Sequence, residues 1–240
     1  MNETQLHKTL KTIYALEIPG SKEEVPVGKY IADIVTPDGN IIEIQTGSLS
    51  HLSSKIKAFT DSGKNVKVVY PLAKEKYIET KMPDGTKKRR KSPSKMNIYS
   101  IFRELTGLCG ILLNEKITLE IPEIIMTEER CRTDEAVQSK NGRRRFRKNW
   151  IKTGKRLEEL KNTHVFHGKK PYLSLIPDGL NETFTFKDFF TEIKKKEPQV
   201  KTDEARLALW CFCRMEIVVR GEKKGRSYTY KVKGEKFISG

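Results

Sequence analysis

Residues 29–45 read KYIADIVTPDGNIIEIQ, and this stretch carries the strongest local signal for the fold. Two apolar segments flank a Pro-Asp-Gly turn at 37–39. Pro-Asp-Gly suits a three-residue hairpin loop, in which a type I turn is followed by a glycine in the left-handed conformation. We therefore expect an antiparallel hairpin in which Thr36 pairs with Asn40.

This register places two carboxylates opposite each other. Asp33 lies across from Glu43, and Gln45 shares the face of Glu43 because side chains alternate along a strand. Ile42 and Ile44 take the other face, toward the core. Opposed carboxylates have β-carbons about 5 Å apart and repel each other unless a cation lies between them. Oxygen ligands of this kind suit Mg²⁺. The alternatives are acids that share a face by chance, or a register shifted by one residue.

The segments around the hairpin predict an α/β layer built on a mixed sheet. Apolar residues at helical spacing indicate helices, and short apolar runs that end at Pro or Gly indicate strands. The expected elements, in chain order, are a helix over 3–16, strands over 29–35 and 41–45, a helix over 49–60, strands over 66–70 and 74–80, a buried helix over 97–113, a strand over 117–125 and a short helix over 155–163.

The order of these elements and acids resembles the PD-(D/E)xK phosphodiesterase superfamily, to which many restriction enzymes, Holliday-junction resolvases and repair nucleases belong. In that superfamily a helix bearing Glu precedes a strand that ends in Asp, and the next strand carries (D/E)-x-K. Here Glu3, Asp33 and Glu43-x-Gln45 follow that order, before the helix from about 49 and VKVVYP at 66–71. The resemblance covers residues 1–80, the motif core. The longer sequence is similar to a group of uncharacterised bacterial proteins with this core.

The resemblance implies a restriction-endonuclease-like core and Mg²⁺-dependent hydrolysis of DNA phosphodiester bonds. Asp33, Glu43 and the backbone carbonyl of Ile44 would hold Mg²⁺, for which Mn²⁺ would substitute. Gln45 stands where the superfamily usually has lysine, so its amide can orient a water but supplies no positive charge. A non-catalytic DNA-binding regulator with a decayed nuclease core is the alternative function.

Glu3 is the fourth expected catalytic residue, together with Asp33, Glu43 and Gln45. It would hold an outer-sphere water or a second metal. Glu17 could fill the same role, but it directly precedes Pro19 and Gly20, which indicate the end of the first helix.

Basic residues are concentrated beyond the first third of the chain. The 240 residues contain 47 Lys and Arg and 31 Asp and Glu, for a net charge of +16. Residues 1–78 carry only +1, whereas 79–186 carry +9 and 187–240 carry +6. Clustered cations neutralise phosphates, and neighbouring aromatic side chains stack on bases. We therefore expect DNA as the partner rather than an anionic membrane; a solvated loop remains the alternative for any single run.

Two basic runs stand out, at 87–95 and 140–156, and Phe146 and Trp150 interrupt the second. The expected DNA contacts in these runs are Arg89, Arg90, Lys91, Arg143, Arg144, Arg145 and Arg147.

The last 60 residues have a different pattern, with two helices followed by two strands. Thr185 and Asp188 form a capping box that opens a helix over 186–196, and a second helix begins at 202. The expected strands flank the basic loop GEKKGR at 221–226. This order is typical of a winged helix, in which the second helix and the hairpin loop contact DNA. The expected contacts are Lys201, Arg206, Lys223, Lys224 and Arg226.

We therefore predict a nuclease-like domain over 1–165 and a winged-helix-like domain over 166–240. A small α+β module for dimerisation or packing is the alternative for the second domain, and the sequence is compatible with a homodimer.

Several other classes of protein lack support. No run of 18 apolar residues and no signal peptide are present, so we expect a cytoplasmic protein without a membrane partner. Four scattered cysteines do not make a disulfide framework. No Walker A motif or dinucleotide-binding glycine pattern occurs. Zinc at His164, His167, Cys211 and Cys213 lacks the usual ligand spacing, and His51 is a residue at a helix start that could reach substrate.

Overall fold

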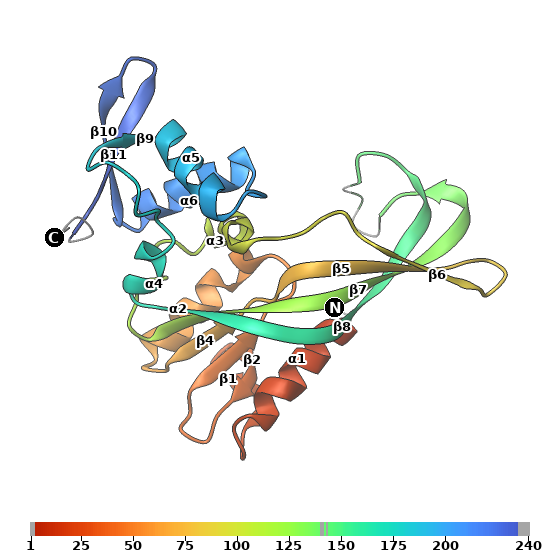
Figure 1. The fold of residues 1–240 in the computed structure, drawn as a ribbon. Coiled ribbons are helices and arrows are strands. Elements are labelled where there is room, and N and C mark those ends of the chain that lie inside the picture. Colours follow the sequence, from red (N-terminus) through yellow and green to blue (C-terminus); the bar gives the residue numbers. More distant parts are fainter. Residues whose placement is uncertain (1–2, 140–141, 143, 235–240) are drawn as a thin grey trace.

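The chain forms a mixed α/β structure with a large mixed sheet and several helices (Figure 1). The computed structural model describes residues 3–139, 142 and 144–234. The helices are α1 (Gln5–Leu16), η1 (Leu49–Leu52), α2 (Ser53–Asp61), η2 (Ile98–Ile101), α3 (Phe102–Leu105), α4 (Lys170–Leu173), α5 (Phe186–Lys196) and α6 (Thr202–Arg214). The strands are β1 (Lys22–Val27), β2 (Tyr30–Val35), β3 (Ile41–Ile44), β4 (Val66–Val69), β5 (Leu72–Lys81), β6 (Lys87–Lys91), β7 (Ile117–Val137), β8 (Lys148–His167), β9 (Phe184–Thr185), β10 (Val218–Lys224) and β11 (Ser227–Val232).

The large sheet has the strand order β1-β2-β3-β4-β7-β5-β6, and β8 pairs with the other edge of β7. Strand β3 runs parallel to β4, and β7 runs parallel first to β4 and then to β5. The remaining pairs are antiparallel. Because β7 is much longer than β4, it joins the strands β1–β4 to the longer strands β5 and β8, and β6 pairs with β5 at the edge.

The hairpin between β2 and β3 has the predicted register. Ile34 pairs with Ile42 and Val35 with Ile41. The amide of Thr36 donates to the carbonyl of Asn40 at 2.9 Å, and Gly39 has a φ of +76°. A positive φ is favourable for glycine, so the local turn chemistry that predicted the hairpin also sets it in place.

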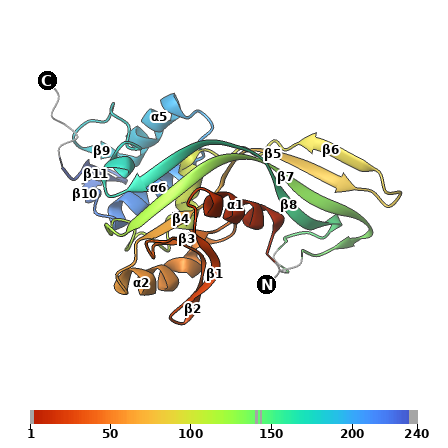
Figure 2. The same cartoon turned by 90° about the horizontal axis from the view of Figure 1, so that it is seen from below.

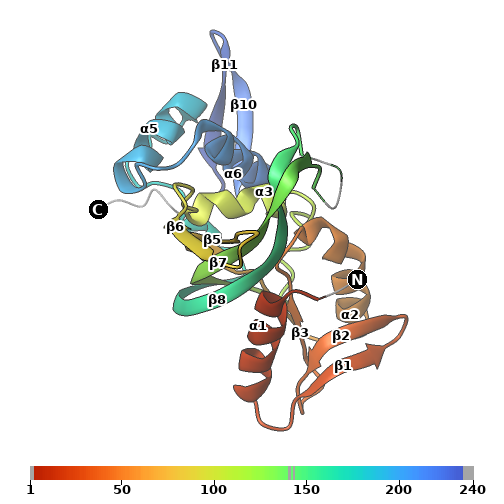
Figure 3. The same ribbon diagram turned by 90° about the vertical axis from the view of Figure 1, so that its right-hand side faces the viewer.

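Helices α1 and α2 cover opposite faces of the strands β1–β3 (Figure 3). On the α1 side, Leu6 and Leu10 pack with Ile42 and Ile44 in one apolar cluster. On the α2 side, the cluster holds Ile41, Ile56, Phe59, Val66 and Val68. The alternation along β3 thus buries Ile42 and Ile44 as predicted, on the face that α1 covers.

Strands β5–β8 continue well beyond the helices, which the sequence did not indicate (Figures 1 and 2). The strand expected over 117–125 extends to Val137, and the helix expected over 155–163 is wrong, because these residues belong to β8. Leu157 and Leu160 have helical spacing, but pairing with β7 along most of β8 outweighs this local pattern. The basic run at 87–91 forms the edge strand β6. We call residues 75–91, 125–137 and 148–159 the sheet extension.

The long helix expected over 97–113 is also wrong. Only η2 and α3 form, and α3 ends at Leu105. Gly107 and Gly110 follow, and glycine inside a helix is unfavourable. A β-carbon on Gly107 would lie 3.2 Å from the backbone of Ser50, so close packing of two turns takes the place of a longer helix.

The C-terminal region has the predicted order of two helices followed by two strands. Strands β10, β11 and β9 form a small second sheet beside α5 and α6. Helix α6 packs on η2 and α3, where Phe102 and Phe212 meet edge to face at 5.0 Å. Because one apolar cluster includes residues of both predicted domains, the boundary near 165 stays a prediction.

Candidate functional site

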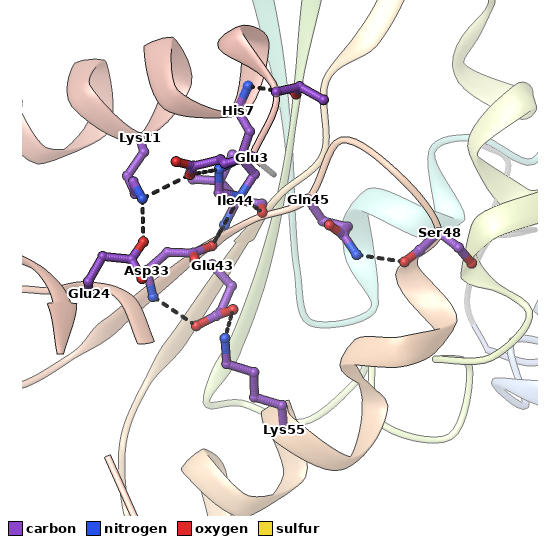
Figure 4. A network of polar contacts seen from close by, with 11 residues as sticks. Glu3, His7, Lys11, Glu24, Asp33, Glu43, Ile44, Gln45, Ser48 and Lys55 are labelled. Atoms are coloured by element: carbon purple, nitrogen blue, oxygen red, sulfur yellow. Dashed lines mark hydrogen bonds and ion pairs between the residues drawn. The ribbon is translucent and has the colours of Figure 1, made fainter. Parts of the chain in front are cut away.

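The predicted acidic residues lie together where β2 and β3 separate, between the two covering helices (Figure 4). The amide of Asp33 donates to Oε1 of Glu43 at 3.2 Å, and the amide of Ile44 donates to Oδ2 of Asp33 at 2.8 Å. The Glu43 side chain is 1% exposed and that of Asp33 is 16% exposed. The hairpin thus brings a buried carboxylate and a largely covered one close together, as its register predicted.

His7, on α1, faces the first of these carboxylates. Its Nε2 lies 2.7 Å from the carbonyl oxygen of Ile44 and 3.5 Å from Oδ2 of Asp33, while its Nδ1 pairs with Glu3. Burial alone would lower the pKa of His7, but the Asp33 and Glu3 carboxylates outweigh it and raise the pKa. In this arrangement the imidazole places a positive charge against Asp33.

Lys55, on α2, faces the second carboxylate. Its Nζ lies 2.5 Å from Oε2 of Glu43, and its side chain is 16% exposed. Burial, with the nearby charge of Asp33, raises the pKa of Glu43 to about 7 even though Lys55 opposes the shift. The pKa of Asp33 moves the other way: burial favours its neutral form, but the bonds from His7 and the Ile44 amide outweigh this and lower the pKa.

The structure brings Glu3, but not Glu17, to the site. Glu3 precedes Thr4, the N-cap of α1, rather than lying inside the helix. It contacts His7, and Lys11 lies 2.8 Å from it and also pairs with Glu24. Glu17 is exposed at the other end of the helix.

Gln45 lies at the end of β3 and is directed away from the carboxylates (Figure 4). Its Nε2 donates to the carbonyl of Ser48 at 2.7 Å. No contact between Gln45 and Asp33 or Glu43 occurs among the residues that the structure describes. The backbone therefore places Glu43 and Gln45 on a common face as predicted. The side-chain amide of Gln45, however, is bonded to the loop that follows β3.

Sequence reasoning missed His7 and Lys55. A signal for the first was present, because Glu3, His7 and Lys11 follow one another at intervals of four residues and so share one side of a helix. Lys55 carries no comparable signal, since its approach to Glu43 depends on how α2 packs on the sheet.

The donor set at this site consists of hard oxygens. Oδ2 of Asp33 and the carbonyl of Ile44 both lie near the same atom, Nε2 of His7, so one cation could reach both. Glu43 adds a neighbouring carboxylate, whose pKa is raised to about 7 by burial and by the charge of Asp33. Oxygen ligands completed by water suit Mg²⁺. Among residues 3–139, 142 and 144–234, no group of three or more His, Cys, Asp and Glu side chains is placed to hold a metal. The candidate ligands at this site are therefore two carboxylates and one backbone carbonyl.

The residues considered for zinc are dispersed. His164 lies 3.3 Å from Glu123, His167 contacts Thr118, and Cys211 is buried against α3. His51 is exposed in η1. In the described part of the chain these side chains form no common site.

The first basic run, as β6, alternates between two faces of the sheet extension. Arg89 lies 4.3 Å from the ring of Tyr77 and 3.8 Å from Glu158, and Lys91 lies 2.5 Å from Glu75. Arg90 is exposed on the other face. Two of the three expected DNA contacts in this run are therefore already paired with acids.

The second basic run surrounds an indole. The guanidinium groups of Arg130 and Arg144 lie 3.6 and 4.1 Å from the ring centre of Trp150. Arg145 lies over Phe146, Arg147 is exposed, and Arg143 is outside the described residues.

These side chains border a cavity of about 840 Å³ that also reaches the candidate site. Its lining includes Glu3, Glu128, Arg130, Trp150 and Lys152. Glu3 thus faces both the cavity and His7, so the carboxylate cluster and the basic, aromatic surface adjoin.

The expected DNA contacts of the C-terminal region lie on α6 and on the β10–β11 hairpin. Lys201 precedes α6, and Arg206 stacks on Phe186 at 4.3 Å. Lys223 lies over Tyr228 at 5.3 Å, and Lys224 and Arg226 are exposed near the hairpin turn. The structure therefore leaves most of these cations at the surface.

Comparison with other proteins identifies a family. The family described as Domain of unknown function (DUF8091) matches residues 4–167. An uncharacterised protein of Treponema pallidum (strain Nichols) is 33% identical over 181 residues, which span 73% of this chain and 68% of that protein. No solved structure matches the chain. The chain belongs to the DUF8091 family, and the matched residues include His7, Asp33, Glu43, Lys55 and the sheet extension.

Within the described part of the chain, every helix is too short or too polar to cross a membrane.

Proposed function

We propose that this member of the DUF8091 family is a metal-dependent nuclease that hydrolyses phosphodiester bonds in DNA. The observation that carries the proposal is the pair of neighbouring carboxylates beside the carbonyl of Ile44, with Glu43 buried and the Asp33 side chain 16% exposed. Acids held close together away from water are costly unless a cation offsets their repulsion. Such a pair, in a protein with a large excess of basic residues, fits a site for Mg²⁺ and a phosphate.

Asp33, Glu43 and the Ile44 carbonyl would hold Mg²⁺, and Mn²⁺ would substitute for it. When bound, the cation would polarise the scissile phosphate and lower the pKa of a coordinated water. Glu3, which contacts His7, is placed to hold a further water at the edge of the site. Gln45 would reach that water only after it leaves Ser48.

Lys55 is our candidate for the positive charge that Gln45 cannot supply. Its ammonium group lies 2.5 Å from Glu43, on the α2 side of the sheet. A lysine beside a scissile phosphate stabilises the negative charge that develops during hydrolysis. We assign this role to Lys55, and to His7 the task of holding Asp33 in place through its Nε2.

In this proposal, residues 1–80 form a core of the restriction-endonuclease type, and α5, α6, β10 and β11 form a winged-helix-like unit. Support comes from the order α1, β2, β3, α2, β4 and from the order of two helices followed by a hairpin. The basic surfaces of the sheet extension and the C-terminal hairpin would hold the DNA backbone.

A second function is a DNA-binding protein without catalysis. One observation favours it: His7 and Lys55 together already offset the charges of Asp33 and Glu43, so the pair can be held without a metal. In that case the two ion pairs would be structural, and the chain would act by binding alone.

Cleavage of plasmid and linear DNA by Asp33→Asn and Glu43→Gln variants tests the proposal, with Asp38→Asn as the matched control. Asp38 is an exposed acid in the turn of the same hairpin. We expect Mg²⁺-dependent cleavage by the parent and by Asp38→Asn, and none by the two site variants, while all four proteins bind DNA. Binding without cleavage in the parent would favour the second function. Equal cleavage by all four proteins would place the active site elsewhere.

A further inference from the structure

We propose that duplex DNA lies on one face of the sheet extension, the face that α1 covers nearer the core, and that the opposite face does not contact it. This inference rests on the proposed function for the nature of the partner and adds the surface that holds it. Charge divides unequally between the two faces of the extension.

On the face opposite α1, most cations are paired with acids. Lys87 lies 3.1 Å from Glu79, and Arg156 lies 2.8 Å from Glu129. The other pairs on this face are Lys91 with Glu75 and Arg89 with Glu158. Four cations thus meet four carboxylates, and of the β5 and β6 cations that the structure describes on this face only Lys81, opposite Lys87, has no ion pair with an acid. This face therefore presents little net charge to a polyanion.

On the α1 side, one carboxylate serves several cations. Glu128 lies 2.5 Å from Arg130, 3.2 Å from Lys152 and 3.7 Å from Lys76. In the described part of the chain these contacts bring no second acid to this face. Lys155 also lies here, with its Nζ 2.8 Å from the carbonyl of Thr46. The α1 side therefore has a clear excess of positive charge.

The edge strand β6 adds two more cations to the same side. Lys88 pairs with Thr80 and Arg90 with Ile78 across the strand, so both alternate with Lys87, Arg89 and Lys91. Both are exposed, and no ion pair joins either one to an acid within the residues that the structure describes. A basic run that looks uniform in sequence is thus divided into a neutralised face and a free face.

The positive face leads directly to the candidate site. Thr46, to which Lys155 donates, follows Gln45 by one residue. The cavity that contains Arg130, Trp150 and Lys152 ends at Glu3. Figure 2 shows the extension reaching out past the start of α1, so a duplex on this face would run toward Asp33 and Glu43.

An aromatic surface lies within the positive face. The guanidinium groups of Arg130 and Arg144 both lie over the ring of Trp150, which remains partly exposed. Planar guanidinium and indole groups give a flat surface against which sugars and bases pack, while the charges face phosphates. This combination favours a nucleic acid over an acidic protein surface.

The test compares two double variants that change net charge equally. Lys88→Gln with Arg90→Gln alters the α1 side, and Lys87→Gln with Lys91→Gln alters the opposite face of the same strand. Binding of the full-length protein to a fluorescent 20-base-pair duplex is measured by anisotropy in EDTA, over a range of salt concentrations. Thermal unfolding confirms that each variant is folded.

We expect the first variant to make the log–log salt dependence shallower by about 2, because each lost phosphate contact contributes about 0.9. The second variant should change it by less than about 0.5. Equal effects, or a larger effect of the second variant, would overturn the inference. If the parent binds DNA on this face but cuts none with Mg²⁺, the proposed catalysis fails and the binding face stands. If the parent binds no duplex at low salt, both fail.

Discussion

At the scale of single residues, the site is defined by two carboxylates whose pKa values move in opposite directions. Asp33 is held ionised by His7 and the Ile44 amide, whereas burial and the charge of Asp33 raise the pKa of Glu43 to about 7. Acid–base pairs with divided pKa values are typical of hydrolytic sites. Lys55 is the one described cation in contact with Glu43, and its charge favours the ionised form of that acid against burial and the charge of Asp33.

Replacing Lys55 should reduce cleavage without unfolding the protein. We expect Lys55→Met to lower the rate of DNA cleavage by about 100-fold, since a group that stabilises charge in the transition state is typically worth that much. Lys57→Met is the control, because Lys57 is exposed two residues further along α2. Rates are measured with Mg²⁺ at saturating DNA, with circular dichroism as the check on folding. Equal rates for the two variants would assign Lys55 a structural role only.

At the scale of elements, the sheet extension is stabilised by the cluster around Glu128. Burial alone would raise the pKa of this carboxyl, but Lys152, Arg130 and Lys76 outweigh burial and lower it to about 2. The side chain is only 10% exposed, so these charges are weakly screened. The cluster thus joins β5, β7 and β8 beyond the reach of the helices.

The lowered pKa of Glu128 makes stability depend on pH. Its folded pKa lies below the ordinary value of 4.5, so the stabilisation is complete above pH 4.5 and is lost as the pH falls toward 2. The difference between the ordinary pKa and the folded pKa corresponds to about 3 kcal/mol of stability. In urea unfolding, Glu128→Gln should lower the free energy of unfolding by about that amount at pH 7, and the difference should vanish near pH 2.

Glu129→Gln is the control for this prediction. Glu129 is the neighbouring residue, its side chain contacts Arg156 on the other face, and it is 30% exposed. A more exposed ion pair is worth about 1 kcal/mol or less. If both variants lose the same stability at pH 7, the cluster around Glu128 is not what stabilises the extension.

A second cluster fixes α6 against the rest of the protein. Glu204 is 9% exposed, and its carboxylate accepts bonds from Ser100 at 2.7 Å, from the Lys201 amide at 2.9 Å and from Asn97 at 3.2 Å. Removing the acceptor leaves buried donors without partners, which costs about 1–3 kcal/mol for each group.

Glu204→Ala should therefore lower the free energy of unfolding by about 3 kcal/mol in urea. Asp203→Ala is the matched control, because Asp203 is the preceding residue and makes an exposed ion pair with Arg103. We expect the control to change stability by less than about 1 kcal/mol. A similar loss in both variants would show that the Glu204 bonds contribute no more than a surface pair.

The elements differ in how far their sequence determines them. The β2–β3 hairpin was predictable in register because a Pro-Asp-Gly turn fixes it locally. The long pairing of β7 with β8 was not, since it depends on residues far apart in the chain and contradicts the helical spacing of Leu157 and Leu160. Strand β6 was hidden by its own charge, because Lys and Arg are uncommon in strands.

The same distinction applies to the candidate site. Asp33, Glu43 and the burial of Ile44 follow from the hairpin, and Glu3 follows from its place before α1. His7 and Lys55 come from two helices that pack on opposite faces of the sheet, so their approach to the carboxylates is a tertiary contact. The spacing of Glu3, His7 and Lys11 shows that they share one side of a helix, but it does not show which strand that side packs against, and Lys55 has no such spacing.

At the scale of the whole molecule, the positive charge lies on two surfaces far apart in Figure 1, the sheet extension and the β10–β11 hairpin. The first 78 residues supply the carboxylates but only +1 of net charge. Lys11, in that part, is buried between Glu3 and Glu24 and cannot meet a phosphate. In the proposed function, recognition of DNA and the candidate chemistry would therefore belong to different parts of one chain.

If one duplex spans both surfaces, their contributions to salt dependence should add. Neutralising Lys88 and Arg90 to Gln should flatten the slope by about 2, and neutralising Lys223, Lys224 and Arg226 by about 2 to 3. The variant with all five changes should then flatten it by about 4 to 5, because well-separated contacts act independently.

The control is Lys8→Gln with Lys57→Gln, two exposed lysines of the first 78 residues, which should leave the slope unchanged. The measurement is duplex affinity from 50 to 300 mM salt for a 20-base-pair and a 40-base-pair duplex. If the variant with all five substitutions flattens the slope no more than the stronger of the two partial variants, the surfaces bind separate duplexes. The chain would then bridge two DNA segments rather than bind along one.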